Sequence, residues 1–321
     1  MKKAILLYNP KAGNRQIVTH LDYISKRVQS MGYELRLYRS EGQGAIENYI
    51  IENITQDNSD MILVSGGDGT LNEAINGLAK KELDIPIGIL PLGTANDFAH
   101  TAGITMSIRG ALDVIEEGIV ESVDIGKVNN KYFVNVCNMG LFSGVSHVID
   151  LELKKNFGKL AYYIKGIEEL HNYQSMNLII TSQEKVIQGK YVLVLIFNGK
   201  GAGGFNKLAK NASITDGKFD VVCIKDVGLY EVPRLFLKVL QGDHLDDPNV
   251  DYIVTSKIEI ECCNEENEFI IDIDGEVGPQ FPLNIEVISN QFKFYLPKNP
   301  TQNVILDRLT EQFNGLMKTH K

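Results

Sequence analysis

The sequence predicts an α/β domain followed by a β-rich domain, because the hydrophobic pattern changes once along its 321 residues. Up to about residue 127, apolar runs typical of buried strands alternate with amphipathic stretches typical of helices. From about residue 128, short β-branched and aromatic runs follow one another between turns. We therefore expect a parallel α/β domain over 1–127 and a β-sandwich domain over 128–299, with a helix over 300–318 at the end.

The first part indicates four strands and four helices in alternation. Apolar residues recur at spacings of three and four from Ile17 to Met31, which indicates an amphipathic helix that ends at Gly32. Strands that are apolar on both faces indicate a parallel sheet with helices on both sides. We expect strands at 4–9, 33–38, 60–65 and 85–91, and helices at 17–31, 45–54, 70–81 and 108–118.

The second part indicates strands that are joined by turns. The runs "MNLIITS", "KIEIEC" and "LNIEVIS" alternate apolar and polar residues, as strands with one buried face do. Two stretches, 144–171 and 228–241, have helical patterns instead. The other expected strands lie at 131–142, 185–199, 219–227, 268–276 and 292–297.

Composition limits the class of protein. A chain that is 44% hydrophobic and 23% charged is typical of a soluble globular protein. It has no run of 18 apolar residues and no signal sequence, so we expect a cytoplasmic location. The net charge of −9 argues against general nucleic-acid binding. The four cysteines have no zinc-finger spacing, which favours a reducing compartment without a zinc site.

Three polar, glycine-bearing loops follow the first, third and fourth strands. They are "NPKAGN" at 9–14, "SGGDGT" at 65–70 and "PLGTANDF" at 91–98. The carboxyl ends of parallel strands meet at one edge of a sheet, where ligands bind. Glycine lets a ligand approach backbone N–H groups closely, and a following helix directs its positive end there. Ordinary turns explain any one of these loops, but their coincidence favours a polyphosphate site.

Asp68 lies inside the third loop, the one that follows the third strand, and it indicates more specifically what the site binds. Neither the Walker pattern nor the dinucleotide fingerprint is present. A carboxylate alone would repel phosphate, so Asp68 indicates a divalent cation that bridges to the phosphates, or a proton acceptor for an attacking hydroxyl. The alternative is a side chain that closes an Asx-turn.

The motifs "NPKAG", "SGGDGTLNEAING" and "GILPLGTANDFA", with "DGE" at 274–276, resemble the diacylglycerol kinase catalytic domain family over nearly the whole chain. The resemblance implies an N-terminal domain like that of NAD kinase and phosphofructokinase, a β-rich domain, and ATP and substrate between them. It also implies that the helix over 300–318 packs back on the first domain. The implied reaction transfers the γ-phosphate of ATP to diacylglycerol, giving phosphatidic acid.

The resemblance also implies which residues bind ATP. Ser40 and Thr94 would contact the nucleotide, and Ser40 keeps the hydroxyl where many relatives carry threonine. Backbone amides of the first and third loops would surround the phosphates. These loop residues are Asn9, Pro10, Lys11, Ala12 and Gly13, then Gly66, Gly67, Asp68, Gly69, Thr70, Leu71 and Asn72.

Acidic residues complete the implied site. Asp274 or Glu276 would take the proton from the substrate hydroxyl, although Asp-Gly is also a common hairpin turn. Asp97 and Asp124 would form a hydrogen-bond and Mg²⁺ network with Asp68, although Asp97 also suits a helix N-terminus. The segment "NASITDGKFD" resembles a structural Mg²⁺ site with Ser213, Asp216 and the backbone near Lys218 as ligands, and a plain turn is the alternative.

Partners follow from the same resemblance. A lipid substrate requires peripheral attachment to a membrane surface, and a homodimer would fit the family. The stretch 153–170 interleaves lysines and aromatic residues (Lys154, Lys155, Phe157, Lys159, Leu160, Tyr162, Tyr163 and Lys165), which suits anionic headgroups or, alternatively, an ordinary helix. Phosphatidylglycerol or a sphingoid base stays open as the acceptor. The loop "PLGTANDFA" points away from NAD as the acceptor, and the presence of Asp68, Asp274 and Glu276 argues against a nucleotide sensor without activity.

Overall fold

The computed structural model describes residues 1–141, 143, 174–199, 209, 212–228, 231, 234–235, 238, 242–264 and 269–299, with only the backbone at 14 and 15. The chain divides into two units. Of the described residues, unit 1 contains Met1–Val123 and 290–299, and unit 2 contains those of Asp124–Ser289. The helices expected at 144–171 and 300–318, most of the one at 228–241, and the basic stretch 153–170 lie outside the described residues.

Unit 1 is built on a parallel sheet, as the alternating pattern predicts, and its strand order is β4, β3, β1, β2. Every residue of β3 and β4 is buried, whereas β2 at the sheet edge has only exposed and partly buried residues. Strands covered on both faces need apolar side chains in both directions, which explains their continuous apolar runs. The strands are β1 (Lys2–Tyr8), β2 (Tyr33–Arg39), β3 (Met61–Gly66) and β4 (Ile87–Pro91).

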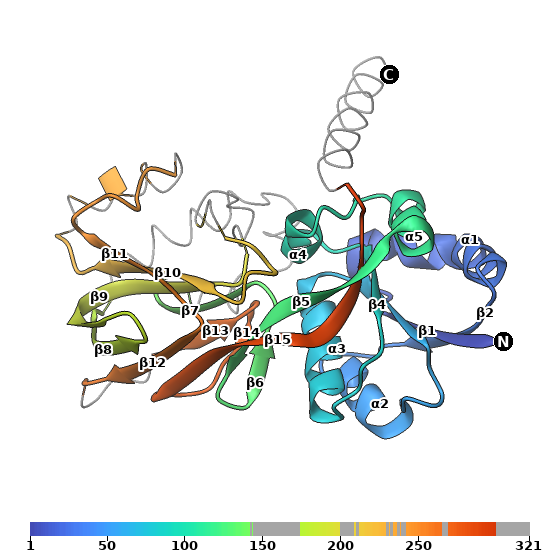
Figure 1. Ribbon diagram of the computed structural model, residues 1–321, viewed down its shortest axis with the longest axis horizontal. Helices are drawn as coiled ribbons and strands as arrows, with labels where there is room; N and C mark the ends of the chain where they lie inside the picture. The colour runs from blue at the N-terminus through green and yellow to red at the C-terminus, as the bar shows by residue number, and fades with distance from the viewer. Residues whose placement is uncertain are drawn as a thin grey trace, which may run out of the picture. The chain divides into compact units, whose positions relative to one another are not determined.

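Helices cover both faces of this sheet (Figure 1). On one face Arg27 of α1 forms ion pairs with Asp113 and Glu116 of α5. On the other face α2 packs against α3, and Gly77 lets the two helices approach closely. The helices are α1 (Gln16–Ser30), α2 (Ala45–Asn53), α3 (Asp68–Lys80), α4 (Asp97–Thr101) and α5 (Ile108–Glu117), with a 3-10 turn, η1 (Ala12–Arg15), before α1.

The last strand, β15 (Leu283–Leu296), adds a further neighbour to β4 in unit 1. Phe294 of β15 pairs with Ile87 in parallel orientation. The ring of Phe294 also lies 4.9 Å, centroid to centroid, from the ring of Phe98 in α4. The end of β15 therefore belongs to the sheet that carries the glycine-bearing loops.

Unit 2 consists of antiparallel strands, which confirms the predicted β-sandwich character of the second half. The long strand β9 lies between β7 and β8, and its end also pairs with β10. The strands are β5 (Ile119–Val128), which begins in unit 1, β6 (Lys131–Phe133), β7 (Val136–Gly140), β8 (Met176–Ser182), β9 (Val186–Phe197), β10 (Phe219–Lys225), β11 (Val250–Thr255), β12 (Lys257–Cys262), β13 (Ile271–Ile273) and β14 (Glu276–Val277).

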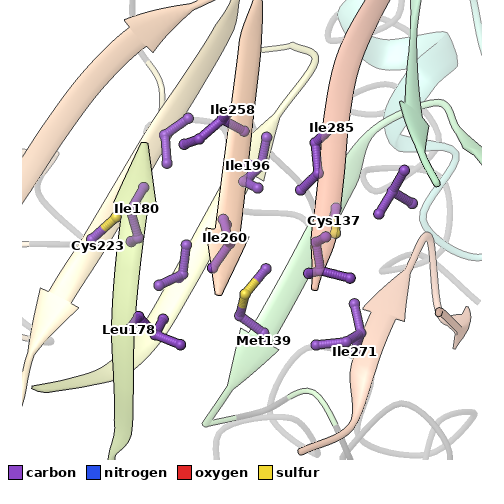
Figure 2. Packing of buried hydrophobic residues seen from close by; sticks show 14 of the residues in the cluster. Cys137, Met139, Leu178, Ile180, Ile196, Cys223, Ile258, Ile260, Ile271 and Ile285 are labelled. Carbon is purple, nitrogen blue, oxygen red and sulfur yellow. The ribbon is translucent and has the colours of Figure 1, made fainter. Parts of the chain in front are cut away.

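Side chains from most of these strands share one apolar interior (Figure 2). Ile258 and Ile260 of β12, Ile196 of β9 and Ile285 of β15 are all fully buried in it. Alternate residues of each strand point inward, so period-two patterns in the sequence become one continuous core. Cys137 and Cys223 also lie in this core, and burial raises the pKa of both thiols.

Candidate active site

The loops that follow the strands of unit 1 meet at one edge of its sheet. The N–H of Asn9, after β1, donates to the carbonyl of Ser65 at 3.0 Å. The N–H of Leu92, after β4, donates to the carbonyl of Gly66 at 2.9 Å. Since β1 and β3 are neighbours while their following helices cover opposite faces, this edge is the switch point at which ligands bind in such sheets.

Glycines allow these loops to touch through their backbones. Gly13 has φ of +53°, and a Cβ there would lie 2.5 Å from the carbonyl oxygen of Leu92. A Cβ on Gly67 would lie 3.1 Å from the Cα of Gly93, so the third and fourth loops are in direct backbone contact. A larger residue at Gly13, Gly67 or Gly93 would force the loops apart, which gives these three glycines a common physical reason.

Asp68 joins the third loop to the fourth. Its carboxylate accepts hydrogen bonds from the N–H groups of Asp97 and Phe98, both at 3.1 Å. These are the first two residues of α4, whose own N-cap residue, Asn96, makes no side-chain capping bond. Asp68 therefore satisfies N–H groups that a helix leaves without intrahelical partners. Asp97 heads α4, as the alternative interpretation of its position expected.

The remaining residues proposed to bind nucleotide differ in exposure. Ser40 is buried, and its N–H donates to the carbonyl of Tyr8 at 2.9 Å, which brings the second loop to the same sheet edge. Asn72 is buried and its Oδ1 accepts from Nδ2 of Asn76 at 2.9 Å. Lys11 and Thr94 are exposed, whereas Pro10 and Thr70 are buried. Backbone hydrogen bonds of Asn9, Ser40 and Leu92 thus bring the strand-end loops of unit 1 to one edge.

In unit 2, Asp274 and Gly275 form the two-residue turn between β13 and β14. Both have positive φ, +53° and +91°, as a type I′ hairpin turn requires. The hairpin interpretation of "DGE" is therefore right for its backbone. Glu276 follows as the first, half-buried residue of β14.

The carboxylate of Asp274 holds a separate segment of the chain. It accepts from the N–H groups of Val134 at 2.5 Å, Asn135 at 2.8 Å and Val136 at 3.0 Å. Three N–H donors stabilise a carboxylate strongly over the neutral acid. The side chain of Asp274 is therefore built into the 134–136 segment.

Asn198, which has no role in the sequence analysis, holds the same segment from its other side. Its side chain is fully buried, and Nδ2 donates to the carbonyls of Asp124 at 2.5 Å and Val134 at 3.0 Å. Its N–H donates to the carbonyl of Asn135 at 2.9 Å. The available signal in the sequence was the position of Asn198 at the end of the apolar run "YVLVLIFNG", which indicates a buried amide. Buried amide groups in proteins are almost always hydrogen-bonded.

We expect Asn198→Ala to lower the free energy of unfolding by about 1–3 kcal/mol, because two buried carbonyl groups would lose their donor. Urea unfolding followed by circular dichroism measures this. Asn130→Ala, at an exposed position, is the control and should change stability by less than about 0.5 kcal/mol. Equal midpoints for Asn198→Ala and Asn130→Ala would contradict the structural role of Asn198.

Asp124 is brought together with the predicted turn at 213–218. Its Oδ2 accepts from the N–H of Gly217 at 2.7 Å, and its own N–H donates to the carbonyl of Ile214 at 2.8 Å. Inside the turn, Asp216 Oδ1 accepts from the N–H of Lys218 at 3.1 Å. Ser213 Oγ lies 3.2 Å from Thr215 Oγ1 and accepts from the N–H of Thr215 at 3.3 Å.

The described residues hold no ready-made cluster of metal-binding side chains. In the part of the chain that the structure describes, no three His, Cys, Asp or Glu side chains lie close enough to hold a metal ion. Asp97 belongs to unit 1 and Asp124 to unit 2. Oxygen donors of the kind that Mg²⁺ prefers are present at Asp68 and in the 213–218 turn.

Comparisons with known proteins match both halves of the chain. Residues 3–128 match the diacylglycerol kinase catalytic domain, and residues 135–295 match the YegS C-terminal NAD kinase beta sandwich-like domain. A diacylglycerol kinase of Bacillus subtilis (strain 168) is 31% identical over 95% of this chain and 99% of its own. One of Staphylococcus aureus (strain bovine RF122 / ET3-1) is 34% identical over 93% of both chains. The chain belongs to the diacylglycerol kinase family.

Solved structures agree with this assignment. A crystal structure of a diacylglycerol kinase from Bacillus anthracis str. Sterne has a TM-score of 0.75, with 29% identity over 92% of this chain and 98% of that one. The family of diacylglycerol kinases consists of enzymes that use ATP as phosphate donor, so the chain is a lipid kinase by family. No helix in the described ranges is long and apolar enough to cross a membrane.

Proposed function

We propose that the chain transfers the γ-phosphate of ATP to the hydroxyl of diacylglycerol and releases phosphatidic acid and ADP. The observation that carries this proposal is that four strand-end loops of unit 1 meet at one edge of the sheet, with glycines at their contacts. Asp68 joins the third of these loops to the fourth by a hydrogen bond. Two relatives whose names say diacylglycerol kinase, 31% and 34% identical, support this acceptor.

The nucleotide would bind at the loops of unit 1. Residues 9–13 and 66–72 would surround the phosphates through backbone N–H groups, except that Pro10 has none and the N–H of Asn9 donates to Ser65. The hydroxyls of Ser40 and Thr94 would lie nearby. The Asp68 carboxylate lies between the phosphate loop and α4, and carboxylate oxygens are the ligands that Mg²⁺ prefers, so we propose Asp68 as a ligand of this ion. When bound, Mg²⁺ neutralises phosphate charge, and Asp97 and Asp124 are its other proposed ligands.

The acceptor step needs a carboxylate that can take a proton. The hydroxyl oxygen bonds to the γ-phosphorus, the bond from that phosphorus to the β–γ bridging oxygen breaks, and ADP leaves. Three backbone N–H groups donate to the carboxylate of Asp274 and disfavour its neutral form. We therefore propose that Glu276 accepts the proton of the hydroxyl and that Asp274 maintains the structure of the turn. The 213–218 turn, with Ser213, Asp216 and Lys218, would hold a structural Mg²⁺.

The acceptor also determines where the protein works. A diacylglycerol substrate lies in a lipid bilayer, so the proposal includes peripheral association with a membrane surface from the cytoplasm. Residues 1–127, in this proposal, bind ATP and residues 128–299 bind lipid. A homodimer is part of the same proposal, and light scattering from the purified chain measures it.

Transfer of radiolabelled phosphate from ATP to a panel of acceptors tests the proposal. We expect label in diacylglycerol presented in mixed micelles with Mg²⁺, and loss of transfer when EDTA removes the metal. The panel includes phosphatidylglycerol, sphingosine and NAD, the last because the second half matches an NAD kinase-like sandwich. Label in NAD alone would overturn the lipid-kinase proposal, and label in another lipid alone would replace the acceptor.

A further inference from the structure

Glu73 lies in α3, just after the phosphate loop, and none of the proposed roles uses it. Its carboxylate accepts a hydrogen bond from the N–H of Ile46 at 3.0 Å. The N–H groups of Gly44 and Glu47 also interact with this carboxylate. A side chain on α3 therefore accepts hydrogen bonds from the first turn of α2.

Helix α2 has no cap of its own at this end. Its N-cap residue is Gly44, which has φ of +76° and no side chain that could accept a hydrogen bond. Ser, Thr, Asp or Asn normally satisfies the first N–H groups of a helix from this position. Glu73 supplies the missing acceptor from another helix. The pKa of Glu73 is raised, chiefly by burial, and the N–H groups of Gly44 and Ile46 oppose this rise, so the backbone bonds offset part of the lost hydration of the carboxylate.

Close packing of α2 on α3 sets the position of Glu73. One turn further along α3, a Cβ on Gly77 would lie 2.9 Å from the Cβ of Ile50. At the end of α3, Lys80 forms an ion pair with Glu47 at 2.5 Å. Glu73, Gly77 and Lys80 follow one another at spacings of four and three, so they form one stripe of α3 that faces α2.

The second loop is thereby held at both ends. At its start, the N–H of Ser40 donates to the carbonyl of Tyr8 in β1. At its end, Glu73 holds the N–H of Ile46, and the hydroxyl of Tyr38 donates to the carbonyl of Ala45 at 3.2 Å. Helix α3 begins at Asp68, so one helix carries part of the phosphate loop and also anchors the second loop.

We propose that Glu73 is a positioning residue for nucleotide binding, which holds the loop of residues 40–44 in place relative to the phosphate loop at the start of α3. The inference rests on the proposed function, in which Ser40 and the phosphate loop contact ATP. Glu73 itself does not touch the nucleotide in this arrangement. Its substitution should therefore weaken binding of ATP and leave the lipid acceptor unaffected.

Calorimetric titration of the full chain with Mg²⁺ and a non-hydrolysable ATP analogue tests this. We expect Glu73→Ala and Glu73→Asp to raise the Kd about tenfold, since alanine has no acceptor and aspartate is too short to reach Ile46. Glu73→Gln keeps an acceptor oxygen at full length and should stay within about threefold of the wild type. Lys80→Ala, which removes a different polar contact between α2 and α3, is the control and should leave the Kd unchanged.

Kinetics separate positioning from a general loss of structure. In the transfer assay, Glu73→Asp should raise KM for ATP and leave KM for the lipid unchanged. If Glu73→Ala does not fold, Glu73→Asp decides, because it keeps the charge. The inference would be overturned by an unchanged Kd for nucleotide in Glu73→Asp or by equal rises in the KM for ATP and the KM for lipid. It would also be overturned if Glu73→Gln bound nucleotide more weakly than Glu73→Asp. A wild-type chain that binds no nucleotide would overturn the proposed function as well.

Discussion

Glu276→Gln is expected to lower kcat for phosphoryl transfer by about 10²–10⁴-fold, the usual contribution of a positioned general base. Glutamine has the same size, so the hairpin of β13 and β14 should keep its pairing of Ile273 with residue 276. The proton of the attacking hydroxyl would then have no carboxylate to receive it. Steady-state kinetics with saturating ATP and diacylglycerol micelles measure kcat, and calorimetry should show an unchanged Kd for nucleotide.

Two further variants make this prediction specific. Glu261→Gln changes an exposed glutamate of β12 and should keep full activity. Asp274→Asn should chiefly lower the free energy of unfolding, by about 1–3 kcal/mol, because its amide group cannot accept all the hydrogen bonds from residues 134–136. Glu276→Gln with kcat within threefold of wild type would show that another group takes the proton.

Asp68→Asn is expected to lower kcat/KM by about 100-fold or more, because the neutral amide would hold Mg²⁺ and the phosphates weakly. Asparagine keeps one oxygen, so one of the two N–H groups of α4, from Asp97 and Phe98, should retain its acceptor. The fold should therefore survive with a modest loss of stability. Activity across a series of Mg²⁺ concentrations measures the effect, and Asp68→Asn should need more metal than the wild type.

Asp68→Ala separates the two roles of this side chain. It should lose as much activity as Asp68→Asn and, in addition, about 0.5–2 kcal/mol of stability, because α4 loses its cap entirely. Asp57→Asn, at an exposed position in unit 1, is the control for both assays. Full activity in Asp68→Asn together with lower stability would show that Asp68 acts only as a cap.

Most of the fold was predictable from local patterns. The strands expected at 4–9 and 60–65 correspond to β1 and β3, and the helix expected at 17–31 corresponds to α1. Their signals are strong because strands buried on both faces are continuously apolar, and helices with one buried face repeat at three and four. The run "FKFYLP" resembled any strand of the second half, and only the pairing of Phe294 with Ile87 places it beside β4.

The sequence predicted which loops form the candidate site, but it did not predict what most of the individual side chains do there. Glycines before a helix indicate a phosphate loop from the sequence itself, since their need for close backbone approach is local. The partners of Asp68 are 29 and 30 residues away, and those of Asp274 are 138 to 140 residues away. Glu73 and Asn198 showed no local signal strong enough to assign them a role.

The sequence by itself determined the alternation of strands and helices, the glycine-bearing loops and the family, because each depends on residues that are near one another in the chain. Only the tertiary structure decided what each acidic residue holds. Asp68 caps α4, Glu73 caps α2 and Asp274 holds residues 134–136, because hydrogen bonds to unpaired backbone N–H groups join elements that the chain order does not bring together. These hydrogen bonds distinguish the carboxylates that hold the site together from Glu276, which we propose accepts the proton of the attacking hydroxyl.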